Sequence, residues 1–425
     1  MSAPSPAIQR WRHASRALNE PAYRRYFLAQ VPLVIGTWIH SIALGWLMWR
    51  LSASPMMLGV LALCDLGPTL LLGPITGTLV DRVDRRRLLL GLICINFVLI
   101  CTLAALAITD SITVLAMLIL TPSIGIIAAF ESPARQALVA ELVAPADLRN
   151  ALALNSLLFN TARLIGPAIG GLVAAWAGEG WAFVLKALAL LPAAYVLATM
   201  RLRAPEPRSR GRFFEDMRAG LGFARSHVEV ARILILVGIC SLTSVPYFSF
   251  LPVLADDMLG ADASLAGLLM SVTGIGSMAA GLMLTFGDRL NAMALWPVAS
   301  AFLLGVLLIG MGLSTSVTLT TALALPMGFA ILSQNLASNT LLQHFAPPGY
   351  RGRVMALYAM MMLGTVPVGS LIAGALAARI GMPSVFILGG ALCAATALAA
   401  AWHRRRYPGP DLMAADPDPS SASRA

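Results

Sequence analysis

Charged residues are scarce in this sequence, and lysine is almost absent. Only 12% of the 425 residues are Asp, Glu, Lys or Arg, while 58% are hydrophobic. Soluble chains carry about 25% charged residues, so a water-soluble domain of this size is excluded, in agreement with the mean hydropathy of +0.79. The apolar runs are too long and too uniform for outer-membrane strands. The composition therefore predicts an integral membrane protein built of helices.

Several signatures of chemistry are also missing. The five cysteines lie inside apolar runs without a CxxC pair, so we interpret them as small buried hydrophobes rather than disulfides or metal ligands. The single lysine, Lys186, lies in an apolar run, and no G-x-x-x-x-G-K-[ST] loop occurs, which argues against an ATP-driven pump. No acid/base cluster or His-rich constellation lies at one depth, which argues against an enzyme. We expect no metal and no cofactor.

The positive charge follows the predicted membrane topology rather than one folded face. The formal net charge is +10, but the basic residues lie in short segments between apolar runs, so nucleic acid is not an expected partner. The N-terminal segment is polar and Arg-rich, without an h-region or cleavage site. The first span is therefore expected to be an uncleaved anchor.

Twelve apolar runs are each long enough to cross a bilayer, which takes about 20 residues. They lie at about 27–49, 58–80, 88–109, 112–137, 151–176, 181–200, 231–255, 264–286, 292–313, 316–343, 354–378 and 384–402.

A polar segment with an amphipathic part divides these runs into two sets of six. The predicted organisation is a cytoplasmic segment at 1–26, a six-helix bundle at 27–200, a cytoplasmic linker at 201–230, a second bundle at 231–402 and a disordered tail at 403–425.

The arginines predict the orientation. With the N-terminus inside, 26 of the Lys and Arg residues fall on cytoplasmic segments, and the outer loops keep only Arg50 and Arg379. Because positive residues favour the cytoplasmic side, both termini are expected in the cytoplasm, with the chain in a cell membrane, the bacterial inner membrane.

An internal repeat supports two related halves. At an offset of 203, Pro145 matches Pro348, Gly166 matches Gly369, and Gly171 matches Gly374. Two six-helix halves that both start inside are parallel repeats, as in transporters that rock about a substrate site near the membrane midplane.

Three sequence blocks resemble the major facilitator superfamily. The segment from Gly77 to Arg86, GTLVDRVDRR, is similar to the family signature between the second and third helices, with Asp84 where the general pattern has glycine. With the blocks at 131–171 and 351–374, it resembles the drug-efflux and siderophore-exporter branch, which includes transmembrane secretion effectors. The resemblance covers nearly the whole chain. It implies twelve helices in two pseudo-symmetric bundles and proton-coupled export.

The second block also resembles the end of the fifth-helix antiporter motif. Gly166, Pro167, Gly170 and Gly171 match it and would let this helix bend and pack closely. The fourth-helix arginine of many proton antiporters is replaced by Thr121. The proton pathway of those relatives is therefore not carried over residue by residue.

The resemblance also implies a cytoplasmic gate. In related transporters these positions form a charge cluster that holds the cytoplasmic side shut. Asp81 is expected to cap a neighbouring helix and Arg85 to reach Glu131. The alternatives are that Glu131 pairs with Arg135 at i+4, or that all are topology charges. The candidate gate residues are Gly77, Asp81, Arg82, Arg85, Arg86 and Glu131.

Two residues are candidates for proton coupling. Asp65 lies within the second span, where an apolar environment favours the protonated carboxyl group; its alternative is permanent pairing with Lys186. His40 lies on a small and polar stripe of the first span, and imidazole titrates in the right range. Its alternative is a packing residue.

The substrate candidates combine a cation with aromatic and amide groups. Arg163, at mid-depth of the fifth span, is suited to an anionic group or a carboxylate, although it is equally compatible with a structural role. Aromatic and soft surfaces suit bulky amphipathic molecules. The candidates are Trp38, Arg163, Tyr247, Gln334, Asn335, Asn339 and Tyr358.

Together these features predict a monomeric secondary transporter in a lipid bilayer that exports a small amphipathic compound by proton antiport. Its partners are the small-molecule substrate and protons, and its energy source is the proton gradient. One alternative is proton-coupled uptake of a small organic solute on the same fold. Another is a non-transporting membrane sensor or enzyme.

Overall fold

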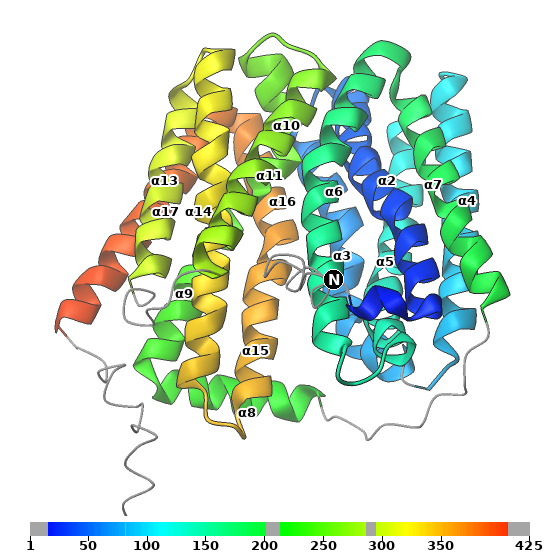
Figure 1. The fold of residues 1–425 in the computed structure, drawn as a ribbon. Coiled ribbons are helices and arrows are strands. Elements are labelled where there is room, and N and C mark those ends of the chain that lie inside the picture. Colours follow the sequence, from blue (N-terminus) through cyan, green and yellow to red (C-terminus); the bar gives the residue numbers. More distant parts are fainter. Residues whose placement is uncertain (1–15, 81, 201–212, 286–294, 407–425) are drawn as a thin grey trace, which may run out of the picture. The chain divides into compact units, whose positions relative to one another are not determined.

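In the computed structural model, residues 16–80, 82–200, 213–285 and 295–406 are described, and they are helical with short turns between helices (Figure 1). Within these ranges, twelve helical segments are long and apolar enough to cross a membrane, and no strand occurs. The twelve predicted spans are confirmed, although most helices run a few residues beyond the predicted apolar run at one end or at both.

Contacts between helices divide the chain into two compact units. Unit 1 contains residues 1–211 and 249–274, and unit 2 contains residues 212–248 and 275–425. The boundaries therefore run through the seventh and eighth spans. The division into bundles at 27–200 and 231–402 stays a prediction.

Unit 1 is built on six spanning helices. They are α2 (Pro21–Ser52), α3 (Pro55–Val80), α4 (Arg85–Ile108), α5 (Val114–Leu142), α6 (Leu148–Ala177) and α7 (Glu179–Thr199). A short 3-10 helix, η1 (Arg16–Asn19), precedes α2. Helix α2 packs on both α6 and α7, α3 packs on α5, and α4 packs on α5 and α7.

The segment 249–274 adds pieces of two further spans to unit 1. It contains α10 (Leu251–Val253), the π-helical η3 (Leu254–Met258) and the first part of α11 (Ala263–Thr285). Helix α10 packs against α2. Part of the seventh span is thereby joined to the first span.

Unit 2 contains the amphipathic helix α8 and the remaining spans. Its elements are α8 (Phe213–Ser226), α9 (Val228–Thr243), most of η2 (Val245–Phe250), the rest of α11, α13 (Trp296–Leu313), α14 (Val317–Phe345), α15 (Arg351–Ala359), η4 (Met360–Gly364), α16 (Thr365–Ile380) and α17 (Met382–Arg406). Helix α13 packs on α14 and α17, α9 packs on α16 and α17, and α8 packs on α15.

Local sequence explains several helix ends. Thr113 and Ser316 cap α5 and α14, because their hydroxyl groups accept from the backbone N–H groups of Ala116 and Leu319. Pro21 starts α2, where its missing N–H costs nothing. These ends hold each apolar helix at a defined length.

Candidate functional site

A cluster of charges joins three helices of unit 1 where α4 begins. Arg85, with only 4% of its side chain exposed, forms an ion pair with Glu141 near the end of α5. Arg86 donates to the last carbonyl groups of α7, from Nε to Leu197 O at 2.5 Å and from Nη2 to Ala198 O at 2.7 Å. Its guanidinium thus satisfies orphan carbonyls at the negative end of the α7 dipole. Two adjacent arginines hold the start of α4 against the ends of α5 and α7.

Asp84 is the N-cap of α4. Its Oδ1 accepts a hydrogen bond from the backbone N–H of Arg87 at 3.1 Å. This role was not predicted, although an Asp directly before a helix is a recognisable start signal. The residue that departs from the family glycine therefore has a local structural function.

The structure corrects the expected partner of Glu131. Glu131 forms its ion pair with Arg135, one turn along α5, which is the alternative that the sequence left open. Arg85 pairs with Glu141 instead, a residue that the sequence reasoning missed. Arg82 is exposed, Gly77 lies in the last turn of α3, and Asp81 lies outside the described residues.

A second group of polar side chains lies between α2 and α7. Lys186 of α7 is 5% exposed, and its Nζ donates to Thr37 Oγ1 of α2 at 2.7 Å. One turn further along α2, His40 is 6% exposed and packs edge-on against Phe183, with ring centroids 5.4 Å apart. Neither ring nitrogen of His40 has a hydrogen-bond partner among the described residues. Among the described residues, Lys186 therefore has one hydrogen-bond partner and His40 has none.

Asp65 lies on α3. It is half-buried, and its backbone carbonyl group lies against Gly125 of α5. Within the described ranges no ion pair joins Asp65 to Lys186, since the partner that Lys186 has there is Thr37. The pairing of these two residues, considered as an alternative from their depth, is not what the structure contains.

Arg163 and Trp38 meet between α6 and α2. The guanidinium carbon of Arg163 lies 5.8 Å from the centre of the Trp38 ring, in a cation–π arrangement. The edge of Trp38 also contacts Phe159 of α6, with ring centroids 5.4 Å apart. The structure thus brings together two predicted substrate residues, and Phe159 adds an exposed aromatic surface.

The glycines of the antiporter-like motif let α6 approach two helices. A Cβ atom added to Gly166 would lie 2.6 Å from Trp38 Cβ, and one added to Gly170 would lie 2.9 Å from Ile39 Cα. A Cβ on Gly171 would lie 2.5 Å from the carbonyl oxygen of Ala263 in α11. Such distances exclude any side chain without movement of backbone. Gly166 and Gly170 therefore pack α6 on α2, and Gly171 packs it on α11.

The far end of α2 carries contacts that the sequence did not predict. Trp49 Nε1 donates to Asp256 Oδ2 of η3 at 2.6 Å. Arg50 and Glu179, at the start of α7, form an ion pair at 2.8 Å. These bonds tie the end of the first span to the π-helical segment and to α7. The sequence does contain a signal for the first of these contacts, because Asp256 is a charged residue at the end of an apolar run and needs a partner.

The substrate candidates in unit 2 lie on α14, α15 and η2. Tyr358 donates to the backbone carbonyl of Asn335 at 3.0 Å, and Asn339 Oδ1 accepts from Gln343 at 2.6 Å. Gln334 is 2% exposed, and its Nε2 has no partner among the described residues. Tyr247 is buried and packs against Phe248 and Phe386.

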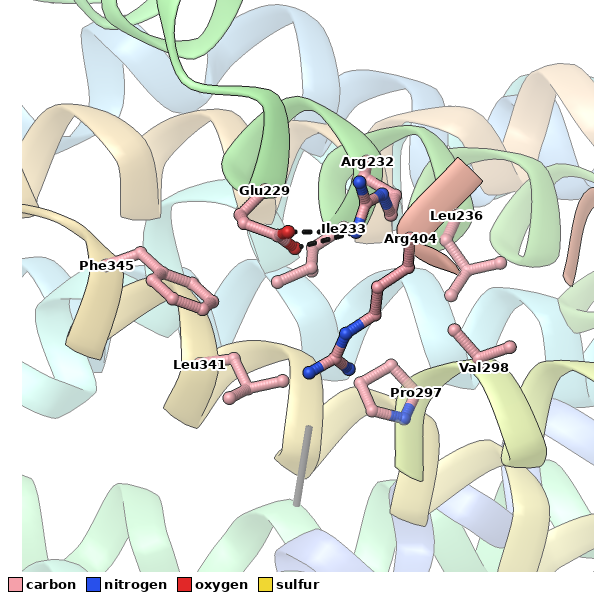
Figure 2. A pocket seen from close by; sticks show the side chains of 9 residues that line it. All are labelled: Glu229, Arg232, Ile233, Leu236, Pro297, Val298, Leu341, Phe345 and Arg404. Carbon is pink, nitrogen blue, oxygen red and sulfur yellow. Dashed lines mark hydrogen bonds and ion pairs between the residues drawn. The ribbon is translucent and has the colours of Figure 1, made fainter. Parts of the chain in front are cut away.

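A small pocket in unit 2 is lined partly by the ion pair of Glu229 and Arg232. Arg232 donates twice to Glu229, at 2.9 and 3.0 Å, and Figure 2 shows this pair beside Arg404. The apolar part of the lining consists of Ile233, Leu236, Pro297, Val298, Leu341 and Phe345. Because α9 and α13 begin here and α14 and α17 end here, this pocket lies at one end of the helices and not at mid-depth, where a transported substrate is expected.

No group of three or more His, Cys, Asp or Glu side chains is placed to hold a metal ion in the part of the chain that the structure describes.

Comparison with known proteins gives a consistent result. Residues 14–422 match the family model described as transmembrane secretion effector. The chain is 26% identical to the staphyloferrin A transporter of Staphylococcus aureus. The alignment covers 86% of this chain and 92% of that protein. It is 23% identical to macrolide efflux protein A of Streptococcus pyogenes, over 85% and 91%, and 26% identical to the enterobactin exporter of Escherichia coli, over 85% and 86%.

Among solved structures, the nucleoside transporter NupG superposes with a TM-score of 0.70. The superposition covers 90% of this chain and 98% of the NupG chain, and the sequence identity is 13%. A likeness at this identity concerns the fold, and it confirms the twelve-helix arrangement predicted from the sequence.

Proposed function

Because the chain belongs to the transmembrane secretion effector family of the major facilitator superfamily, we propose that it exports small amphipathic compounds, drug-like or siderophore-like, from the cytoplasm by proton antiport. The family and the relatives named above are transporters and not enzymes, so the chain is a multi-pass membrane transporter. Export, the substrate class and proton coupling are the parts that we propose.

The relatives support the direction and the substrate class. Two of them are named for outward movement of a compound, a macrolide in one case and enterobactin in the other. Together they span amphipathic drugs and siderophores, which is the range that we propose here.

The observation that carries the proposal is the set of ionisable side chains inside the spans of unit 1. Lys186 and His40 lie between α2 and α7, Arg163 lies over Trp38, and Asp65 lies on α3. A Lys, Arg or Asp at the centre of a span costs about 2.5–3.5 kcal/mol to insert into a bilayer, so such residues usually have a function. Asp65 or His40 would carry the proton, and Arg163 would contact substrate.

The working cycle follows from alternating access. The protein would act as a monomer in a cell membrane, with both termini in the cytoplasm and with protons and substrate as its partners. Inward proton flow would supply the energy, without a cofactor. The charge cluster at Arg85 and Arg86 would hold the cytoplasmic side closed during part of the cycle.

Membrane vesicles of opposite orientation test the proposal. Inverted and right-side-out vesicles carrying the protein are given an imposed pH gradient and radiolabelled erythromycin or enterobactin. Export predicts that inverted vesicles with an acidic interior accumulate one of these compounds and that a protonophore stops the accumulation. Accumulation by right-side-out vesicles with an acidic exterior would instead indicate uptake by symport. Binding without flux would indicate a sensor.

A further inference from the structure

Lys186 is a buried cation with an incomplete set of hydrogen-bond partners. An ammonium group has three N–H donors, and Thr37 Oγ1 is the one acceptor that Lys186 has among the described residues. Thr37 also donates to the carbonyl group of Leu33 at 2.9 Å, so its hydroxyl hydrogen is already used. Two N–H donors of the ammonium group are therefore left without an acceptor among the described residues.

The charges around Lys186 do not balance. The charged side chains that act on it electrostatically are Glu131 and Arg135 of α5, and these two pair with each other. The pair is neutral, so a protonated Lys186 leaves this group with one net positive charge. A buried cation without a counter-charge is costly unless an anion approaches it.

A second donor lies beside Lys186. His40 is one turn from Thr37 on α2, is 6% exposed, and has no hydrogen-bond partner at either ring nitrogen among the described residues. Lys186 also acts electrostatically on His40. A neutral imidazole carries one N–H donor. An acceptor between α2 and α7 would therefore satisfy groups on both helices.

Thr37 places one member of this group at the surface of unit 1. Thr37 is exposed, whereas Lys186, which bonds to it, and His40 are buried. The next residue of α2, Trp38, carries the aromatic contact with Phe159 and the cation–π contact with Arg163. An aromatic surface thus lies one residue along α2 from the hydroxyl group that Lys186 contacts.

We propose that Lys186, Thr37 and His40 form a subsite that binds the carboxylate of a transported amphipathic anion. The carboxylate accepts from the ammonium group and from the imidazole N–H, and the apolar part of the compound packs on Trp38 and Phe159. This inference rests on the proposed transport function and narrows its substrate class. A carboxylate suits the site because charge-assisted hydrogen bonds are the strong ones.

The single lysine makes a direct test possible. The full-length protein is produced with lysine carrying ¹³C at Cε, which gives one side-chain signal because Lys186 is the only lysine. 4-Phenylbutyrate is then titrated into the protein in detergent micelles, with 4-phenylbutyramide as the neutral control. The acid is expected to shift the Lys186 signal with saturation, and the amide is not. An unmoved signal, or equal shifts with both compounds, would overturn the subsite.

Affinity measurements on variants give an independent readout. Lys186→Met is expected to weaken binding of 4-phenylbutyrate by roughly 30-fold or more, and Lys186→Arg, which keeps the charge, by less. Arg379→Met, at an exposed position in the last turn of α16, is the matched control and leaves binding unchanged. Equal affinity of Lys186→Met and the wild type would contradict the proposal. If Lys186→Met does not fold, the titration of the wild type decides.

The two proposals fail separately. Proton-driven transport of erythromycin with an unmoved Lys186 signal would leave export standing and remove the carboxylate subsite. A shifted signal without flux in vesicles would keep the subsite and remove the transport function.

Discussion

At the scale of single residues, the Arg85–Glu141 pair is expected to contribute more to stability and transport than the neighbouring charged residues do. Arg85 is 4% exposed and Glu141 is 25% exposed, so truncating Arg85 leaves a partly buried carboxylate without its partner. We expect Arg85→Ala to lower the free energy of unfolding by about 2–3 kcal/mol, below the cost for a fully buried pair, and to reduce transport by roughly tenfold. Thermal unfolding in detergent and vesicle transport measure the two effects.

The control for this prediction is the neighbouring Arg87, whose side chain is 84% exposed and pairs with Asp84 at 3.5 Å. Arg87→Ala is expected to change stability by less than about 0.5 kcal/mol, because exposed ion pairs contribute little. If Arg85→Ala and Arg87→Ala behaved alike, the packing of Arg85 against α5 would have no role in the gate.

Asp65 is one of the two residues, with His40, that are predicted to carry the proton. Asp65→Asn keeps the size of the side chain and removes its titration, so we expect pH-driven accumulation to be lost while exchange of substrate down its gradient continues. Vesicle transport with and without an imposed pH gradient measures both.

Asp110→Asn, at an exposed turn position after α4 with φ of 50°, is the matched control. It should leave both activities intact, since Asn tolerates this backbone conformation. Persisting pH dependence in Asp65→Asn would move the proton site elsewhere.

The sequence predicted which residues carry charge inside the membrane but not which of them meet. Depth along a span placed Asp65 and Lys186 at a similar level, yet Lys186 bonds to Thr37. Depth is a one-dimensional quantity, whereas contact also requires the rotation of each helix, which side-chain packing sets. The partner Glu131 that the resemblance implies for Arg85 is likewise not the one that packing selects, which is Glu141.

At the scale of elements, α6 depends on its glycines for two different contacts. A Cβ on Gly171 would lie 2.5 Å from Ala263 O and 3.0 Å from Gly267 Cα. Because backbone atoms cannot move aside as a flexible side chain can, even Gly171→Ala is expected to separate α6 from α11. We expect an overpacking cost of about 1–3 kcal/mol and slower transport.

Gly91 in α4 is the matched control, since a Cβ there meets no atom within 4 Å. Gly91→Ala should leave transport unchanged and raise stability by up to about 1 kcal/mol, the usual difference in helix propensity. Thermal unfolding and vesicle transport compare the two variants. Normal transport by Gly171→Ala would show that the close approach of α6 to α11 is dispensable.

Element boundaries were predictable from apolar runs, whereas the irregular segments inside two spans were not. The seventh span changes from α-helix to 3-10 helix at Val245–Phe250 and to π-helix at Leu254–Met258, and the eleventh contains a π-helical turn at Met360–Gly364. Hydrophobicity averages over such turns and is insensitive to them. π-Helical turns often occur at functional sites, and the one in the seventh span holds Asp256 against Trp49.

At the scale of the whole molecule, the sequence repeat and the contact units are different divisions. The repeat separates the chain after its sixth span, while segment 249–274 packs with the first six spans. A sequence repeat compares positions along the chain, whereas packing depends on which surfaces meet. Trp49 with Asp256, and Gly171 with Gly267, are among the contacts that this segment makes within unit 1.

Orientation in the membrane is the last feature that the sequence predicts for the molecule as a whole, and labelling from the two sides tests it. In a background where the native cysteines are serine, Arg87→Cys and Ser111→Cys place exposed thiols at opposite ends of α4. Because the arginines gather on the side assigned to the cytoplasm, an impermeant maleimide should label Ser111→Cys in intact cells and Arg87→Cys in inverted vesicles. The opposite pattern would place the Arg85–Glu141 cluster outside the cell, and a cytoplasmic gate at that position would then be impossible.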